Sequence, residues 1–278
     1  MWYIYISMID ENQKGQAVLI VLLSLSVVLV IVLFILSRSI TDISLSTKEE
    51  DSSRAFSAAE AGVERALVIG NSSGSLELAT FDANVASFAQ GSSVVRYPIS
   101  LKSGENATFW FKRPGETAYS GNKAMFCWGD KNTTIDNQTP AIEISVYYLQ
   151  AGVYKIARVS LDANSSRIAS NNFNLASSGT CTIDGEQFQF YSTIDLPIPG
   201  TLQYATAKIL YNTTVAHKIG IDVSVSTTAS KTLPSQGAKV ESDGSYGDAN
   251  RSIEVYQLHP ETPPIFANAI YSSSGIVK

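Results

Sequence analysis

The most regular hydrophobic pattern in the chain is an uninterrupted apolar run near its start. Residues Ala17 to Leu36 contain no charged side chain, and only Ser24 and Ser26 are polar. A helix rises about 1.5 Å per residue, so a helix of this run covers the ~30 Å hydrocarbon core of a bilayer. A core strand is far shorter, and a core helix carries a polar face. The run therefore predicts one membrane-spanning helix.

The pattern after this run predicts that the same helix continues. Residues 37–69 contain no proline and a single glycine, Gly62. Phe56, Ala59, Val63 and Ala66 or Leu67 recur at steps of three and four, which predicts one stripe that packs on a following domain. A glycine-rich stretch from residue 70 to 74 marks the end of the helix. We therefore expect a helix over 16–70, with a membrane span at 17–36 and an amphipathic half at 37–70.

Beyond Gly74 the hydrophobic period changes to two, and turn-forming clusters separate the apolar segments, which is typical of strands. We expect residues 71–278 to form a mostly antiparallel β-domain that packs against the helix, with two subregions meeting near residues 197–200. The predicted fold class is α+β. The predicted strands are 93–101, 108–112, 141–149, 152–161, 186–194, 206–211, 218–225 and 252–258.

The residues before the apolar run decide between two kinds of leader. A secretory signal has a basic start, a shorter apolar stretch and a small-residue cleavage site beyond it. Here the leader contains Asp10 and Glu11 with a single basic residue, Lys14, and the run is followed by Arg38. The pair Lys14-Gly15 stands directly before the run, which is where a different processing enzyme would cut. Translation from Met1 or from Met8 is compatible with this leader.

Together these features resemble the class III leader and N-terminal helix of type IV pilins and pseudopilins. The matching elements are Lys14-Gly15, a mature start at Gln16 and the uncharged helix that follows. Residues 54–62 read RAFSAAEAG, and Phe56, Ala59, Glu60, Gly62 and the adjoining Val63 resemble the helix signature of minor pilins of the PilX type. The resemblance covers about the first 70 residues of the sequence.

The resemblance implies a processing pathway and a set of partners. A prepilin peptidase would remove residues 1–15 and leave Gln16 as the methylated N-terminus. The helix would lie in membrane lipid before assembly and contact other pilin subunits in an extracellular filament afterwards. The β-domain would be displayed outside the cytoplasmic membrane, as in a structural minor pilin.

Two features depart from the pattern of major pilins. Their mature helix usually has a glutamate at its fifth position, where this chain has Ile20. Isoleucine cannot pair with the amine of a neighbouring subunit, which favours an accessory role. Lys14 precedes the span, whereas Arg38, Lys48 and Arg54 follow it, so the positive-inside rule favours the opposite orientation. An N-terminus in the cytoplasm therefore rests on the resemblance.

The charge and cysteine content of the chain bear on its function class and on the compartment of the β-domain. Only 16% of residues are charged and the net charge is −5, which argues against a nucleic-acid-binding surface. Cys127 and Cys181 are too far apart for a CxxC motif. They are interpreted as one disulfide in an exported domain, with two buried thiols as the alternative.

The sequence contains little that supports catalysis. His217 and His259 are isolated, and no GxSxG, P-loop or GxGxxG motif is present. Residues 130–136 alternate oxygen-bearing side chains like a calcium loop but lack its glycine and closing glutamate. We expect no enzyme activity, no metal site and no cofactor. Aromatic residues that could form an adhesive surface, although most such residues lie in cores, are Trp110, Trp128, Tyr147 and Tyr148.

Two alternatives to a pilus subunit remain. One is a pseudopilin of a secretion or DNA-uptake system. The other is a membrane-anchored surface adhesin that does not polymerise.

Overall fold

Helix α1 (Gln13–Ile69) dominates the first part of the structure, a computed structural model that describes residues 13–261, with only the backbone for residues 13–15. Its 57 residues correspond to a length of about 85 Å. The helix ends where Gly70 adopts a φ of 83° and donates its N–H to the Ala66 carbonyl at 2.9 Å. Such a left-handed residue commonly ends a helix. The prediction that one helix contains both the apolar run and the following segment is confirmed.

The described residues after α1 form fourteen strands and one short helix. They are β1 (Ser72–Leu76), β2 (Ala79–Phe88), β3 (Val94–Arg96), β4 (Asn106–Trp110), β5 (Lys123–Asp130), β6 (Ala141–Gln150), β7 (Val153–Asp162), α2 (Ser165–Asn171), β8 (Asn174–Leu175), β9 (Ser177–Ile183), β10 (Glu186–Asp195), β11 (Thr201–Leu210), β12 (Ile219–Asp222), β13 (Gly237–Tyr246) and β14 (Ala249–Leu258).

Contacts divide the chain into two units. Unit 1 comprises the described residues up to Ala83 together with Ser242–Ile253, and unit 2 comprises Asn84–Glu241 and the described residues from Glu254. Unit 2 is thus largely an insertion between two parts of unit 1. The segment 197–200 connects β10 to β11 within unit 2 and does not separate the units.

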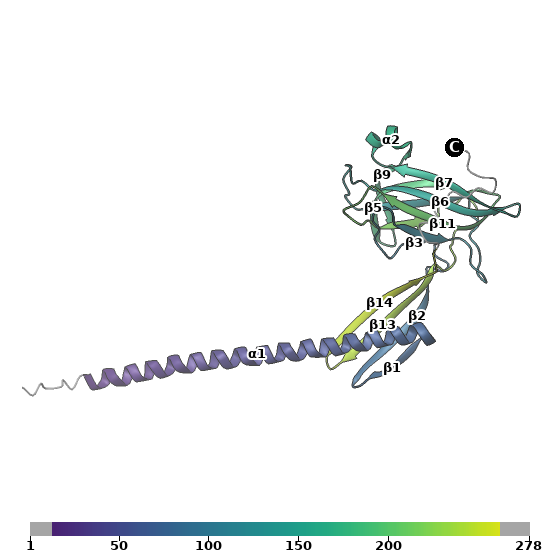
Figure 1. Cartoon of the computed structure of the whole chain (residues 1–278). Coiled ribbons are helices and arrows are strands. Elements are labelled where there is room, and N and C mark those ends of the chain that lie inside the picture. Colours follow the sequence, from purple (N-terminus) through teal and green to yellow (C-terminus); the bar gives the residue numbers. More distant parts are fainter. Residues whose placement is uncertain (1–12, 262–278) are drawn as a thin grey trace, which may run out of the picture. The chain divides into compact units, whose positions relative to one another are not determined.

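Unit 1 consists of α1 and parts of a four-stranded sheet with the strand order β1-β2-β13-β14. Figure 1 shows these strands beside the C-terminal part of α1. The first hairpin is antiparallel, with Ser72 opposite Ala83 and Leu76 opposite Ala79. Strand β13 therefore pairs with β2, which follows the helix closely in the sequence, and β14 pairs with β13 at the edge of the sheet.

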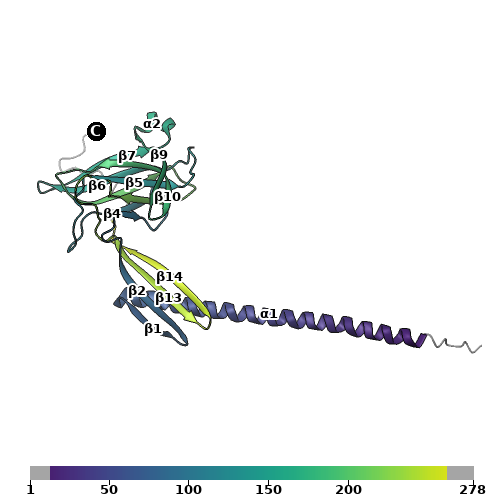
Figure 2. The same ribbon diagram turned by 180° about the vertical axis from the view of Figure 1, so that it is seen from behind.

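Unit 2 is built on two five-stranded sheets, which Figure 2 shows from behind. One has the order β3-β12-β5-β10-β9 and the other the order β4-β11-β6-β7-β8. Side chains from both sheets form one buried cluster that includes Phe109, Phe126, Trp128, Ile144 and Phe190. The alternation that predicted strands is thus explained by one face of each sheet turning toward a shared core. Neighbouring strands in these two sheets are antiparallel except β7 and β8, which are parallel.

The predicted hairpin at 141–149 and 152–161 is confirmed as β6 and β7. Ala151 and Gly152 form its two-residue turn with φ values of 51° and 79°. The predictions missed β1, β2, β5, β8, β9, β13 and α2, and they placed the start of β11 five residues late, at 206 instead of 201. Strands β1, β9 and β13 are rich in serine and glycine, so hydrophobic alternation alone identifies them poorly. In β5, four consecutive buried residues replace the alternation.

Cys127 on β5 and Cys181 on β9 form a disulfide, as expected, with their Cα atoms 6.2 Å apart. Strand β10 lies between β5 and β9 in the sheet order. Both cysteines are buried and pack with Ile183 and Phe188 in a cluster separate from the main core. The bridge therefore joins the two neighbours of β10 on one face of the sheet.

Removing this disulfide should destabilise unit 2. Closing a loop of 54 residues is worth about 4 kcal/mol in the chain-entropy model. We expect Cys127→Ser, or reduction of the wild type, to lower the thermal midpoint of unit 2 by roughly 10 °C. Circular dichroism with and without reductant measures the shift, and equal midpoints would contradict the expected contribution.

Candidate functional site

The first half of α1 presents an apolar surface that no other described part of the chain covers. Every described side chain from Ala17 to Leu36 is exposed. Its two polar side chains are satisfied locally, because the Ser24 and Ser26 hydroxyls donate to the Val21 and Leu23 carbonyls at 2.8 Å. By length and composition this segment can cross a membrane as a single span. A β-rich region follows it.

The second half of α1 buries a narrow stripe of small residues against the sheet. Its buried members are Ala55, Ala58, Ala59, Gly62, Val63 and Ala66. The expected stripe was therefore partly wrong. Phe56 remains 46% exposed and Leu67 is also exposed. The stripe contains alanines where a larger apolar side chain was expected, because the sheet lies too close to the helix to accommodate a ring.

Two glycines allow this close approach within unit 1. A Cβ atom on Gly62 would collide with the Ser242 Oγ of β13 and lie 3.0 Å from the Phe81 ring of β2. A Cβ atom on Gly244 would collide with the Ala55 carbonyl and lie 2.6 Å from the Ala59 backbone nitrogen. The helix and β13 are therefore in contact through their backbones at Gly244, and at Gly62 only the small Ser242 side chain lies between them.

Two arginine side chains, one on α1 and one on β14, form contacts between the helix and the strands. Arg54 forms an ion pair with Glu50 at 2.8 Å and lies over the Tyr246 ring at 5.0 Å. The hydrogen bond to Glu50 is the main cause that raises the Arg54 pKa, so this side chain stays charged. On β14, the Arg251 Nε donates to the Ser52 hydroxyl at 2.8 Å. Strands β13 and β14 are thus both attached to α1 by polar contacts.

The structure separates the predicted site residues into distinct places. Lys14 and Gly15 lie in the first turn of α1, where only the backbone is described, and Gln16 is exposed. Of the signature residues, Ala59, Gly62 and Val63 face the sheet, whereas Phe56 and Glu60 are exposed. The disulfide lies in unit 2. Residues 1–12, which contain most of the expected leader, lie outside the described residues.

Sequence reasoning missed the partners of the signature. Ser242 and Gly244 on β13 contact the helix, and Ala55 and Ala58 are as deeply buried as Ala59. A signal existed in the sequence: small residues at alternate positions, Ser242 and Gly244, place two small side chains on one face of a strand. These residues are far from the helix in the sequence, so the pattern alone does not predict that they contact it.

The calcium-like segment uses its carboxylates locally. Asp136 accepts hydrogen bonds from the Gln138 N–H at 2.7 Å and the Thr134 hydroxyl at 3.1 Å. Asp130 accepts from the Lys218 N–H at 3.1 Å. Among the described residues, no group of three histidine, cysteine or acidic side chains is placed to hold a metal ion. These contacts are those of a polar turn.

His217 is buried beside Asp130. Burial lowers the pKa of His217, and the nearby Asp130 carboxylate, 3.6 Å from Nδ1, only partly opposes this effect. The Asp130 N–H donates to Nδ1 at 3.4 Å, which requires the neutral ring. Burial likewise lowers the pKa of His259, which lies near Arg113 and Glu116.

These shifts predict that stability decreases in mild acid. The unfolded chain has ordinary histidines with a pKa near ~6.5, so below that pH it binds more protons than the folded chain. Stability should be fully present above this pH and be lost as the pH falls through the lower folded-state pKa. Thermal midpoints at pH 8, 6 and 5 measure the loss. His217→Gln should flatten the dependence, and an unchanged slope would contradict the role of His217.

Comparison of the chain with protein-family models, curated protein sequences and solved structures found no match. Helix α1 combines an exposed apolar half with a half that is locked to a sheet.

Substitution of Gly244 tests the backbone contact between α1 and β13. A Cβ at this position meets backbone atoms of Ala55 and Ala59, which cannot rotate away. We expect Gly244→Ala to destabilise the attachment by about 2 kcal/mol, and hydrogen exchange in β13 and residues 50–66 should accelerate. Asp243→Ala, on the exposed face of the same strand, serves as the control. Equal exchange in the two variants would contradict the contact.

Proposed function

We propose that the chain is an accessory, minor-pilin-like subunit of a type IV filament. A prepilin peptidase cleaves it after Gly15, and the apolar half of α1 holds it in the membrane until assembly. The helix then packs among the helices of other subunits, while the β-rich region lies outside the cell. The proposed role is structural.

The observation that carries this proposal is the contrast between the two halves of α1. Residues 17–36 expose hydrocarbon along their whole circumference, whereas the second half is fixed by Ala55, Ala59 and Gly62 to a sheet. Exposed apolar surface on this scale requires lipid or other apolar helices around it. The uncovered half of α1 can therefore lie in lipid first and pack among the helices of other subunits later, while the other half stays attached to the sheet.

The identity of residue 20 supports the accessory role. Ile20 is exposed on the apolar half of α1 and offers no carboxylate to the N-terminal amine of a neighbour. A subunit without this charge pair gains only apolar contacts when its helix enters a helical bundle. Such a subunit suits a position at a filament end or in low copy number better than the repeating position of a major pilin.

The mass of the mature N-terminus tests the proposal directly. We expect a chain that starts at Gln16 and carries one methyl group on its amine, because Lys14-Gly15 ends the leader. Intact-protein and peptide mass spectrometry of membrane fractions measures this start. A mature protein that begins at Met1 or Met8 would overturn the proposal.

A matched pair of variants controls this experiment. Gly15→Leu should block cleavage because the small residue before the cut is lost, whereas Gln13→Ala leaves Lys14 and Gly15 intact and should be processed normally. Sheared extracellular fractions should contain the processed wild type and lack the Gly15→Leu chain. Processed protein that remains entirely in the membrane would favour the non-polymerising adhesin.

A further inference from the structure

The outer face of one sheet in unit 2 has an unusual arrangement of side chains. In the sheet β4-β11-β6-β7, the residues Phe109, Ala205 and Val146 point into the core. Their neighbours Trp110, Tyr204 and Tyr147 therefore lie on the opposite face. The register places Tyr204 opposite both Trp110 and Tyr147, and Tyr147 opposite Ile156. Four strands thus contribute one continuous row of large apolar side chains to the surface.

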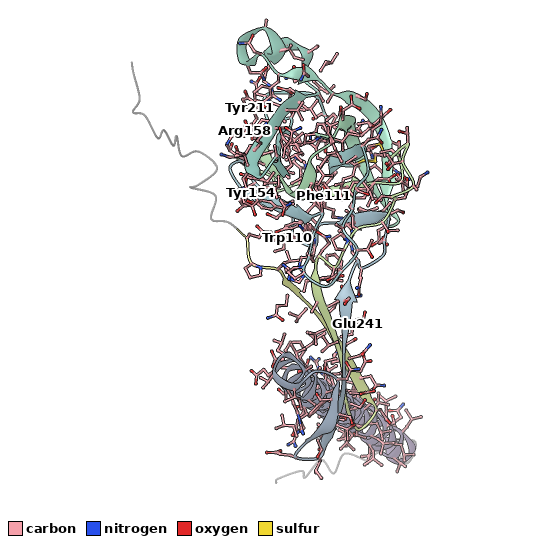
Figure 3. All side chains as sticks on the ribbon, turned by 90° about the vertical axis from the view of Figure 1, so that its right-hand side faces the viewer. Trp110, Phe111, Tyr154, Arg158, Tyr211 and Glu241 are labelled. Carbon is pink, nitrogen blue, oxygen red and sulfur yellow. A yellow bond between two sulfur atoms is a disulfide. The ribbon has the colours of Figure 1, made fainter. Side chains whose placement is uncertain are left out.

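The rings of this row are in contact with one another. The centroids of Trp110 and Tyr204 are 5.1 Å apart, and those of Tyr204 and Tyr147 are 4.4 Å apart in a stacked arrangement. On β7, Tyr154 is 75% exposed. Figure 3 shows Tyr154, Arg158 and Trp110 on unit 2, with Phe111 in its interior. The row is therefore preorganised, because the rings hold each other in place.

These side chains line a surface groove with a volume of about 480 Å³. Its lining residues are Trp110, Tyr147, Tyr154, Lys155, Ile156, Gln203 and Tyr204. A concave, mainly aromatic site with a few polar groups is the usual composition of a ligand site. Trp128 and Tyr148, two of the aromatics considered from the sequence, are not in it. Trp128 is buried, and Tyr148 packs against the core.

The polar groups around the groove indicate the chemistry of its ligand. Gln203 lies in the groove itself. Lys155 is paired with Tyr148, so its side chain points to the other face of the sheet, where its ammonium donates to Gln150 at 2.9 Å. The next row on the groove side consists of the short, buried hydroxyl residues Thr108, Thr206 and Ser145 and ends at the exposed Arg158. The aromatic row is therefore bordered on β7 by a cationic side chain.

Charge on this face is of one prevailing sign. Arg113 lies over the Trp110 ring at 5.2 Å, and Arg158 and Lys208 point to this face from β7 and β11, with Glu143 on β6 opposite Lys208. The chain as a whole has a net charge of −5. A locally cationic, aromatic groove on an acidic protein is complementary to a ligand that combines apolar faces with carboxylates.

We propose that this groove binds an acidic polysaccharide, a chain of pyranose units that carries carboxylate groups. The C–H face of a pyranose ring covers an aromatic side chain, its hydroxyls suit Gln203, and its carboxylates suit Arg113 and Arg158. Single-stranded nucleic acid fits less well, because it needs a track of several cations for its phosphates, whereas Arg113 lies over Trp110 of β4 and Arg158 is three strands away on β7. A peptide strand would add at a sheet edge.

The inference concerns unit 2 and does not rest on processing or filament assembly. The test uses the full chain in detergent, titrated with hexagalacturonic acid and followed by calorimetry and tryptophan fluorescence. Binding should be weaker for the neutral cellohexaose and should weaken as salt increases. No binding of hexagalacturonic acid, or equal binding of the neutral hexamer, would overturn the proposal.

Variants locate the site. Tyr154→Ala should weaken binding about tenfold by removing the most exposed ring, and Tyr154→Phe should retain most of it because the ring face remains. Arg158→Gln should reduce the preference for the acidic hexamer, whereas Lys155→Gln, which alters a side chain on the other face of the sheet, should leave this preference unchanged. Since Tyr154 is largely exposed, its substitution should leave the thermal midpoint unchanged.

Two control variants alter exposed residues outside this face. Ile135→Ala removes a side chain that is 53% exposed in another loop, and Lys131→Gln removes a charge nearby. Both should bind like the wild type. Wild-type affinity in Tyr154→Ala, or an equal loss in the controls, would overturn the assignment. Tighter binding of a thymidine oligonucleotide that depends on Tyr154 would show that the ligand class is wrong.

Discussion

The backbone contact between α1 and β13 is the constraint on which unit 1 depends. A helix and a strand normally meet through side chains, but here Gly62 faces Ser242 and Gly244 faces the backbone of Ala55 and Ala59. The free energy of this contact comes from dispersion between closely spaced atoms and from the apolar surface of the alanines. It also leaves no alternative register, because any larger side chain in the stripe would hold the strand away from the helix.

That contact explains why the helix signature consists of small residues. Alanine at 55, 58 and 59 and glycine at 62 would be unremarkable on a solvated helix, yet each is buried in this one. The exposed position of Phe56 has the same origin: a ring cannot enter a gap of backbone width. The larger apolar side chains of the helix are instead on its uncovered surface, where they are available to lipid or to other helices.

The sequence predicts the helix well because its signals are local. An uncharged apolar run, the absence of proline and a glycine after the last turn define α1 within a few residues. The β6–β7 hairpin is predicted for the same reason, since alternation and an Ala-Gly turn are adjacent in the chain. The cysteine pairing was also accessible, because only two cysteines exist.

Features that depend on distant residues could not be predicted in this way. The pairing of Gly62 with Ser242, the outward position of Tyr147 and the inward position of Trp128 follow from the register between strands that are far apart in the sequence. Trp110 and Trp128 have similar sequence surroundings, but one lines a groove and the other donates its indole N–H to the Pro140 carbonyl in the core at 2.8 Å. Only the strand order distinguishes them.

The division of unit 1 between the two ends of the chain has a consequence for biosynthesis. Residues 242–253 emerge from the ribosome only after nearly all of unit 2 has been made. The surface of α1 that contacts β13 must therefore remain uncovered while the inserted region is translated, and ordering of this long-range contact is intrinsically slow. A stripe of alanine and glycine exposes little apolar surface during that time. It therefore favours neither chaperone binding nor association with a second nascent chain.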